Sequence, residues 1–540
     1  MLKLRNYLPK IVLILFLLIL VVQRFYLVDI SQWREDQATN YWLGETLKLN
    51  EFSVGLISSK EIPNPNGLIL IGKFLSIIND FKFSIIIFSL IQLFIIYFFI
   101  QRVEIEGTKQ IKQLLFLAIA SSPYIVMSSF ELWSQFLYIT LNLLSLLLVF
   151  NSKDNNVNPI VLILFIFLLP SFYLAGLLNL LALLALVFFL FISKKKTIKV
   201  SGSPYINFVY LLVIIFVINY VWRPYFNAFN LDQLIGIVSE EKTRLDILSV
   251  IKKVFFNFSF EEPYLIQSDL SIYSITTLRL RTALKLFHLL LSIYFLLIFV
   301  TSTFLRLAGK NKKLSIDFYI PGLFIAFCYF LSPIIGGPNF ILNERPDINL
   351  QFYPLYLIFI YMISNKLFEI KHIGKLLKQI NSISLFVLFA LNSLFLVNLY
   401  HDYKNYDGEI LSNSDIPLIH KIKVVDYIYE DFKESKNDKT LKIYYDLGGD
   451  GFDWIPGFGE KLTPYYDAPY TLGRIFDLLF YKKYGLINEQ EGVQLRSKEN
   501  VDYILTYRDF PKVDYKLLPP VNEVIDINRF RILTFQNQNE

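Results

Sequence analysis

Long apolar runs with almost no charged side chains recur along the first 400 residues of the chain, and they are the feature that most restricts its fold. One of them, residues 85–100, reads IIIFSLIQLFIIYFFI. Runs of about 17 to 20 apolar residues fit the hydrocarbon core of a bilayer, and in lipid such runs must be helical because every backbone polar group needs a partner within the segment. We expect about eleven spanning helices, centred near Ile19, Phe94, Ala118, Ser145, Phe165, Ala185, Ile215, Tyr294, Phe324, Ile360 and Ala390.

The composition supports this class. The chain is 54% hydrophobic and only 18% charged, whereas about 25% of the residues of a soluble chain are charged. The charged residues are confined to certain loops, so the net charge of +6 reflects loop placement and not a nucleic-acid surface. The single cysteine, Cys328, excludes an internal disulfide and a thiolate metal cluster. The scattered histidines (His288, His372, His401 and His420) are expected at the surface or the interface.

The distribution of Lys and Arg predicts the orientation. With a cytoplasmic N-terminus, the basic clusters of the connecting loops, such as residues 194–199, all fall inside, and the short outer turns have almost none. No small-residue cleavage site follows the first apolar run, so we expect a retained anchor. An odd number of spans then places the C-terminal segment outside. The residue usage is typical of an AT-rich bacterium, which predicts a multi-pass protein of the bacterial plasma (inner) membrane.

Three regions on the outer side are too long to be simple turns. Loops 29–82 and 223–283 contain short amphipathic stretches that we expect in the interface plane. Residues 401–540 have the composition of a soluble domain. The predicted fold class is therefore an all-α polytopic membrane domain, residues 1–400, followed by a small extracytoplasmic α/β domain, residues 401–540.

Three segments of this C-terminal region have clear secondary-structure patterns. Residues 440–449 (TLKIYYDLGG) and 501–510 (VDYILTYRDF) combine aromatic and β-branched residues with partial alternation, which predicts two strands. Residues 471–485 between them (TLGRIFDLLFYKKYG) predict a helix that ends at Gly485.

An acidic pair stands directly after the first apolar run. The stretch VDISQWREDQATNYWLG begins at Val28 and contains Glu35 and Asp36, a few residues from the expected membrane edge. A structural interpretation is available, because acids in the first turn of a helix capped by Asp29 or Ser31 would be stabilised by the helix dipole. Further polar clusters on the same side of the membrane favour a functional site.

Those clusters lie in other outer segments. Glu131 in SSPYIVMSSFELWSQ stands at the head of the fourth span, where it could equally be a first-turn acid. Arg345 is the only cation of GGPNFILNERPDINLQFYPLYL; it could snorkel harmlessly or hold a phosphate with two hydrogen bonds. The segment SKEIPNPNGLILIGKFL predicts a proline-ordered turn that leads into an interfacial helix.

Together, the acidic pair after the first span, the Pro-Asn turn, the acid of the second outer turn and the ER…YPLY segment resemble the GT-C superfamily. More narrowly they resemble bacterial membrane glycosyltransferases related to protein O-mannosyltransferases and to the aminoarabinose transferase of lipid A. The resemblance covers about residues 1–400 and is one of position and topology. It implies that an acid of the first outer loop is catalytic and that the donor is a polyprenyl-phosphate-linked sugar.

Two departures from the family pattern affect the assignment. The order here is Glu35-Asp36 where the family usually has Asp then Glu, so either acid could occupy the catalytic position, and we favour Asp36. Pro346 and Asp347 follow Arg345 in place of the commoner aromatic residue. The candidate site residues are thus the charged groups of the outer loops: Asp36 and Glu35 as catalytic residues, and Arg345, Glu131 and Arg279, with Arg281 as an alternative, for the substrate and its phosphate.

The implied chemistry suits these residue types. A lipid phosphate is already a good leaving group, so the reaction needs a base for the acceptor hydroxyl and cations for the departing phosphate. We expect direct displacement with inversion. No residue is assigned as a ligand of a resident metal, although Glu35, Asp36 and Glu131 could hold Mg²⁺ or Mn²⁺ through oxygen.

Other functions remain open at this point. A flippase or transporter of a lipid-linked glycan would carry ionisable groups inside its spans or interrupted helices, which this pattern lacks. A lipid-linked polysaccharide polymerase or ligase would use the same donor with another acceptor. A membrane-anchored binding protein would leave the acids structural. The acceptor itself could be a glycan, a lipid or a protein.

Overall fold

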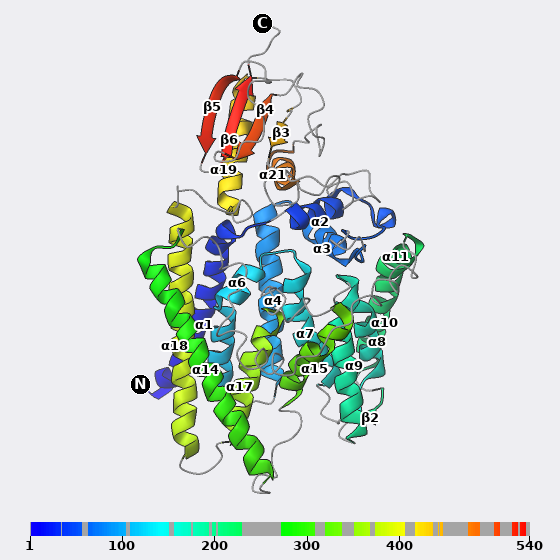
Figure 1. Ribbon diagram of the computed structural model, residues 1–540, viewed down its shortest axis with the longest axis vertical. Coiled ribbons are helices and arrows are strands. Elements are labelled where there is room, and N and C mark those ends of the chain that lie inside the picture. Colours follow the sequence, from blue (N-terminus) through cyan, green and yellow to red (C-terminus); the bar gives the residue numbers. More distant parts are fainter. Residues whose placement is uncertain are drawn as a thin grey trace.

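The computed structural model of the chain is mostly helical among the residues that it describes (Figure 1). These residues are 2–33, 35–56, 63–103, 109–150, 156–173, 176–193, 197–200, 203–228, 272–307, 319–336, 350–367, 373–405, 416–435, 441, 443–446, 474–485, 502–507, 521–527 and 530–535.

A bundle of long apolar helices forms most of the molecule. Its helices are α1 (Leu2–Leu27), α4 (Phe81–Arg102), α5 (Lys109–Ala120), α7 (Ser134–Phe150), α8 (Pro159–Leu168), α9 (Gly176–Ile192), α10 (Pro204–Val217), α14 (Ile275–Leu307), α15 (Ile320–Gly336), α17 (Tyr353–Leu367) and α18 (Ile373–Asn405). Each of the predicted span centres lies inside one of these helices.

The two spans with the shortest apolar runs are short in the structure as well. Helix α5 has 12 residues and α8 has 10. Pro170 ends α8 as predicted, because the chain passes into a 3₁₀ turn at Leu169–Ser171. Within the described part of the chain, four helices are long and apolar enough to cross a bilayer: Phe81–Arg102, Pro204–Ala228, Ile275–Thr301 and Lys378–Asn405. The count of eleven spans therefore stays a prediction.

Large apolar side chains cover the outside of the bundle. Phe94, Phe188, Leu290 and Val397 are each more than half exposed although they belong to four different helices. Soluble monomers rarely expose apolar surface on this scale. Exposed aliphatic and aromatic groups all around long apolar helices are what lipid contact requires, and the chain is an integral membrane protein.

Shorter elements lie at the end of the bundle nearest the sheet (Figure 1). They are the 3₁₀ turn η1 (Val28–Ile30), α2 (Glu35–Thr46), the 3₁₀ turn η2 (Leu49–Glu51), α3 (Gly67–Ser76) and α6 (Pro123–Ser128). The Pro-Asn turn does lead into a helix, α3. Helix α2 differs from the expected amphipathic interfacial helix, because residues 37–44 are all buried.

A π-helical turn, η4 (Ile218–Trp222), follows α10 and leads into α11 (Arg223–Ala228). The indole of Trp222 donates to the carbonyl of Phe167 at 2.9 Å, and Asn66 donates to the carbonyl of Tyr220 at 3.0 Å. This end of α10 is thereby joined to the segment between α1 and α4. Most of predicted loop 223–283 lies outside the described residues.

The C-terminal region contains α19 (Leu418–Ser435), α21 (Arg474–Tyr484) and a sheet with the order β3-β4-β6-β5. Its strands are β3 (Ile443–Asp446), β4 (Tyr503–Tyr507), β5 (Val521–Ile527) and β6 (Phe530–Phe535). Strands β3 and β4 are parallel, with α21 between them in the chain, and β4, β6 and β5 are antiparallel. A parallel pair requires a crossover of this kind.

The predictions for this region are confirmed at the level of elements. Both predicted strands form, as β3 and β4, and the predicted helix forms as α21. It ends where Gly485 adopts a φ of +70° and donates its N–H to the Tyr481 carbonyl at 2.8 Å, the left-handed helix ending that glycine favours. Figure 1 shows the sheet beyond one end of the bundle. The division into domains at residue 400 stays a prediction, because one hydrophobic core runs from the bundle into α19, α21 and the sheet.

Two strands of two residues each pair in parallel: β1 (Asn156–Val157), between α7 and α8, and β2 (Thr197–Ile198), between α9 and α10.

Two histidines correct the expectation of surface placement. His288 and His420 are 1% and 2% exposed, since each lies on the buried face of a helix whose other face is exposed.

Candidate functional site

The chain between the first helix and the acidic pair is held in an unusual backbone conformation. After η1, residues 31–33 run without helix or strand into α2. Trp33 has a φ of +41°, the only positive φ among the described non-glycine residues. A bulky side chain in this region costs roughly 1–3 kcal/mol and persists only where the surroundings over-determine it.

The Trp33 side chain supplies part of that restraint. Its indole N–H donates to the carbonyl of Phe130 at 2.9 Å. Its ring packs edge-on against Phe81 and Tyr41, with centroid distances of 4.7 and 6.0 Å. Trp33 is therefore fixed between the turn after α6, the start of α4 and the middle of α2.

Glu131 lies in the same turn after α6 and is 1% exposed. Its Oε1 accepts the backbone N–H of Gln32 at 2.8 Å and that of Trp33 at 3.5 Å. The carboxylate thus binds the backbone just before the acidic pair. The predicted role in substrate binding is neither required nor removed by these contacts.

Lys421 of α19 approaches the same two residues. Its Nζ donates to the carbonyl oxygens of Gln32 and Trp33 at 2.8 and 3.0 Å. The Leu418 N–H donates to the Ser31 carbonyl at 2.8 Å. The N-terminal end of α19 is therefore hydrogen-bonded to the segment that precedes the acids.

Asp36, the second residue of α2, is partly exposed, whereas residues 37–44 are all buried. Asn40 donates its side-chain amide to the Asp36 carbonyl at 2.8 Å, which strengthens this first turn. The side chain of Glu35 and the whole of Arg34 lie outside the described residues. The predicted caps act elsewhere: Ser31 donates to the Val28 carbonyl at 2.6 Å, and Asp29 forms an ion pair with Lys82.

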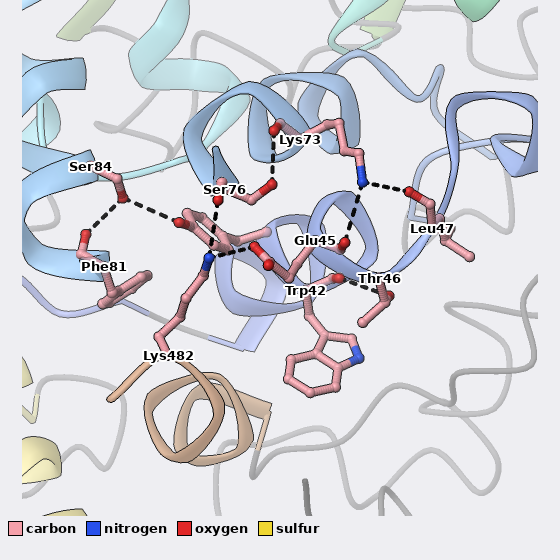
Figure 2. A network of polar contacts seen from close by, with 10 residues as sticks. Trp42, Glu45, Thr46, Leu47, Lys73, Ser76, Phe81, Ser84 and Lys482 are labelled. Atoms are coloured by element: carbon pink, nitrogen blue, oxygen red, sulfur yellow. Dashed lines mark hydrogen bonds and ion pairs between the residues drawn. The ribbon is translucent and has the colours of Figure 1, made fainter. Parts of the chain in front are cut away.

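Helix α2 packs closely on α3 through two glycines. A Cβ on Gly44 would lie 2.4 Å from the Lys73 nitrogen, and one on Gly72 would lie 2.6 Å from the Asn40 carbonyl oxygen. Both obstacles are backbone atoms, so only residues without a side chain permit this approach. Lys73 adds a polar link, since its Nζ donates to the carbonyls of Leu47 and Glu45 at 2.8 and 3.3 Å (Figure 2).

The other face of α2 is covered by α21. Figure 2 shows Lys482 reaching from α21 to Glu45; the ion pair is 2.6 Å long and its side chains are 6% and 15% exposed. Lys482 also donates to the Ser76 carbonyl at 3.1 Å. Arg474 lies over the Trp42 ring at 5.1 Å, and Tyr481 packs edge-on against that ring at 5.7 Å.

Tyr41 is a neutral hydrogen-bond donor in this arrangement. Ser84 donates its hydroxyl hydrogen to the Phe81 carbonyl at 2.7 Å. Because that hydrogen is already used, the Tyr41 hydroxyl must be the donor in its 3.2 Å hydrogen bond with Ser84. Burial raises the pKa of Tyr41, with a further contribution in the same direction from Glu45. The hydroxyl therefore remains protonated and links α2 to α4.

The predicted phosphate-binding arginines differ in how far they are buried. Arg279 is exposed near the start of α14, whereas Arg281 is partly buried and lies over the Tyr273 ring at 5.7 Å. Burial raises the pKa of Tyr124 in α6, and the positive charge of Arg281 opposes that shift. Arg281 is thus electrostatically coupled to the helix that leads into the Glu131 turn. Arg345 lies outside the described residues.

The YPLY segment forms the start of α17 and packs against α6. Tyr353 packs edge-on against Tyr124 at 4.9 Å, and its hydroxyl lies 3.0 Å from His288 Nε2. His288 Nδ1 lies 2.8 Å from the Leu284 carbonyl. A ring nitrogen facing a carbonyl must carry the hydrogen, so Nε2 of the neutral imidazole accepts from the Tyr353 hydroxyl.

No group of three or more His, Cys, Asp and Glu side chains within the described parts of the chain could hold a metal ion. The side chain of Glu35 lies outside the described residues, so the possible Mg²⁺ or Mn²⁺ set of Glu35, Asp36 and Glu131 stays open. Lys421 and Lys482 were not singled out from the sequence. The only available signal was an amphipathic helix pattern in residues 418–435, and such a pattern does not identify what its buried lysine contacts.

No protein-family model matches the chain, and no curated protein matches it. Solved structures similar to it in fold include ArnT from Cupriavidus metallidurans in the apo state, at 10% sequence identity over 98% of this chain and 100% of that chain, with a TM-score of 0.46. The same protein bound to undecaprenyl phosphate matches at 10% identity over 97% of this chain and 98% of that chain, with a TM-score of 0.44. ArnT is an aminoarabinose transferase of the GT-C type, the group that the outer-loop pattern of this sequence resembles.

Proposed function

We propose that this membrane protein is a glycosyltransferase that moves a sugar from a polyprenyl-phosphate donor to an acceptor hydroxyl on the outer side of the membrane. The observation that carries the proposal is the position of Asp36. It is a partly exposed carboxylate at the start of a helix whose next eight residues, 37–44, are buried, and the backbone before it is strained and held by charged groups.

A carboxylate on a helix whose preceding backbone is restrained suits a base that meets a lipid-linked substrate. Catalytic groups need fixed geometry, because reacting atoms must converge within a few ångströms. The segment just before Asp36 is held by Phe81 at the start of α4, by the turn after α6 and by Lys421 of α19. The outer-loop resemblance assigns the same acidic pair to catalysis, and the structural observations are compatible with that assignment.

In the proposed reaction, Asp36 removes the proton from the acceptor hydroxyl while the oxygen of that hydroxyl attacks the anomeric carbon of the donor sugar. The bond from that carbon to the phosphate oxygen breaks, and the polyprenyl phosphate leaves with the electron pair, with inversion at carbon. Glu35 is the neighbouring or substitute base. Cationic help for the leaving phosphate is proposed for Arg345, with Arg279 or Arg281, because guanidinium groups bind phosphate with paired hydrogen bonds.

The catalytic assignment predicts a selective loss of turnover. Purified protein reconstituted in vesicles with labelled polyprenyl-phosphate sugars should transfer sugar, and Asp36→Asn should lower kcat by about 10²–10⁴-fold, the usual contribution of a general base. Glu35→Gln should lower it less. Glu51→Gln is the matched control, because Glu51 is an exposed carboxylate of the same outer loop.

Transfer at the control rate in both Asp36→Asn and Glu35→Gln would refute the assignment. Movement of the labelled lipid across the bilayer without transfer would instead support a flippase. Transfer to a growing glycan chain would support a polysaccharide polymerase or ligase. Repeating the assay after dialysis against EDTA decides whether Mg²⁺ or Mn²⁺ takes part.

A further inference from the structure

We propose that Lys421 and Lys482 are positioning residues for the catalytic carboxylate, because they hold helix α2 at its two ends from the C-terminal region. Lys421 acts on the backbone just before the acids, and Lys482 acts on Glu45 near the last turn. The inference rests on the function proposed above, since it concerns how the same carboxylate is oriented. It makes α19 and α21 parts of the active site although neither contributes a reacting group.

The first contact restrains the backbone of two consecutive residues through both their N–H and their C=O groups. The N–H groups of Gln32 and Trp33 donate to Glu131 Oε1, and their carbonyls accept from Lys421 Nζ. Hydrogen bonds that involve a charged partner are about twice as strong as neutral ones. Glu131 and Lys421 are 1% and 5% exposed, so water screens these contacts little.

The hydrogen bonds from Glu131 and Lys421 act where the backbone is strained, at Trp33. Trp33, with its φ of +41°, stands three residues before Asp36 and sets the direction in which the chain enters α2. Without Lys421, two buried carbonyls would lose a charged donor, and rotation of Trp33 to negative φ would relieve the strain. That rotation would reorient the first turn of α2, in which the acids stand.

The second contact restrains the far end of the helix. Lys482 pairs with Glu45 and donates to the Ser76 carbonyl (Figure 2). Its Nζ also lies over the Tyr41 ring at 5.8 Å. It therefore connects α21 to α2, and through Ser76 to the end of α3. Contacts before its first residue and in its last turn restrain the helix against sliding and tilting relative to the bundle.

A simple docking role for the two lysines would differ in a measurable way. Docking of the C-terminal region is already provided by aromatic contacts, such as Tyr481 and Arg474 against Trp42. If the lysines only helped docking, their loss would lower stability and leave the turnover of the folded protein intact. If they position Asp36, their loss lowers kcat in protein that is still folded.

The activity test compares Lys421→Met with Lys421→Arg. We expect Lys421→Met to lower kcat by about 10–100-fold, the range expected for an ångström-scale misplacement, with the KM for the donor nearly unchanged. Lys421→Arg should restore most of the activity, because a guanidinium can still donate to both carbonyls. The matched control is Lys423→Met, since Lys423 is exposed on the same helix. Lys482→Met should likewise lower kcat, and its control Lys483→Met removes the neighbouring lysine.

A second measurement needs no activity. In an Asp36→Cys variant, a membrane-impermeant maleimide should react about threefold faster or more when Lys421→Met is also present, because the released segment opens locally, and Lys423→Met should not change the rate. Cys328 is fully buried, so its labelling reports unfolding within the same sample.

The outcomes separate the two proposals. If the unsubstituted protein transfers no sugar, the proposed function fails, and the labelling rate alone still decides whether Lys421 holds the segment. If it transfers sugar and Lys421→Met matches Lys423→Met in kcat and in labelling, the positioning role of Lys421 is refuted. If Lys421→Met exposes Cys328, the decision passes to Lys421→Arg and Lys482→Met, and full kcat of folded Lys482→Met would overturn the proposal.

Discussion

Among single residues, Glu131 shows how one carboxylate can have a role that sequence position does not suggest. It stands where a first-turn acid of α7 is expected, yet its Oε1 accepts the backbone N–H groups of Gln32 and Trp33, which follow α1. The contact joins segments that are about a hundred residues apart in the chain. Glu131 is therefore a support for the acidic pair whether or not it also touches substrate.

Replacement of Glu131 separates these two roles. Glu131→Ala leaves two buried N–H groups unpaired and should lower the unfolding free energy by about 1–3 kcal/mol for each, measured by thermal unfolding in detergent. Glu131→Gln keeps a carbonyl acceptor of the same shape and should stay close to the unsubstituted protein in stability. Loss of transfer by a stable Glu131→Gln protein would add a direct role at the substrate, and equal stability of the Ala and Gln variants would contradict the support role.

At the level of elements, the pair formed by α2 and α3 is the platform of the site. Gly44 and Gly72 allow the two helices to approach until backbone contacts backbone. Polar links from Lys73 to the end of α2 and from Tyr41 to α4 complete the platform. Glycine is needed here for space and not for a left-handed φ, as in close helix packing within membranes.

This packing makes Gly44 a sensitive position. Gly44→Ala places a methyl group 2.4 Å from the backbone nitrogen of Lys73. Helix α3 must therefore shift, and the protein should lose about 1–3 kcal/mol of stability, the usual cost of overpacking. Thr46→Ala, an exposed position on the same helix, should change little. An unfolding temperature of Gly44→Ala equal to that of Thr46→Ala would show that the two helices do not approach so closely.

On the scale of the whole molecule, the acidic pair, the Glu131 turn, α19 and α21 all gather at one end of the bundle, the end beyond which the sheet lies (Figure 1). The distribution of Lys and Arg predicts that this end faces away from the cytoplasm. One hydrophobic core joins the bundle to the C-terminal elements. The C-terminal region is therefore a structural continuation of the site and not a detached module.

The predicted orientation can be tested by cysteine labelling in intact cells. Lys423→Cys on α19 should react with an impermeant maleimide from outside, whereas Lys109→Cys at the start of α5 should react only after the cells are permeabilised. Both lysines are exposed, and Cys328 is buried and gives the background. The opposite pattern would invert the topology and place the candidate base in the cytoplasm.

The membrane class and the positions of the helices follow from sequence for a local physical reason. Bilayer thickness and backbone hydrogen bonding set a length and an apolarity that each helix must satisfy by itself. The end of α8 at Pro170 and the end of α21 at Gly485 are equally local, because each depends on the backbone of one residue. The number of spans and the orientation remain predictions.

The arrangement of the site could not be obtained in this way. Sequence order alone shows that the acids stand after the first long apolar helix, and this position identified the candidate base. The support of Gln32 and Trp33 by Glu131 and Lys421 joins residues far apart in the chain, and so does the pairing of Lys482 with Glu45.

The amino-acid sequence by itself determined a helical membrane protein with an acidic pair after its first long helix, because apolar length and residue order are properties of single segments. Only the tertiary structure decided that Asp36 remains partly exposed while the next eight residues of its helix, 37–44, are buried. It also decided that two lysines of the C-terminal region hold that helix. Burial and pairing of this kind depend on which distant segments meet, and no local pattern encodes that choice.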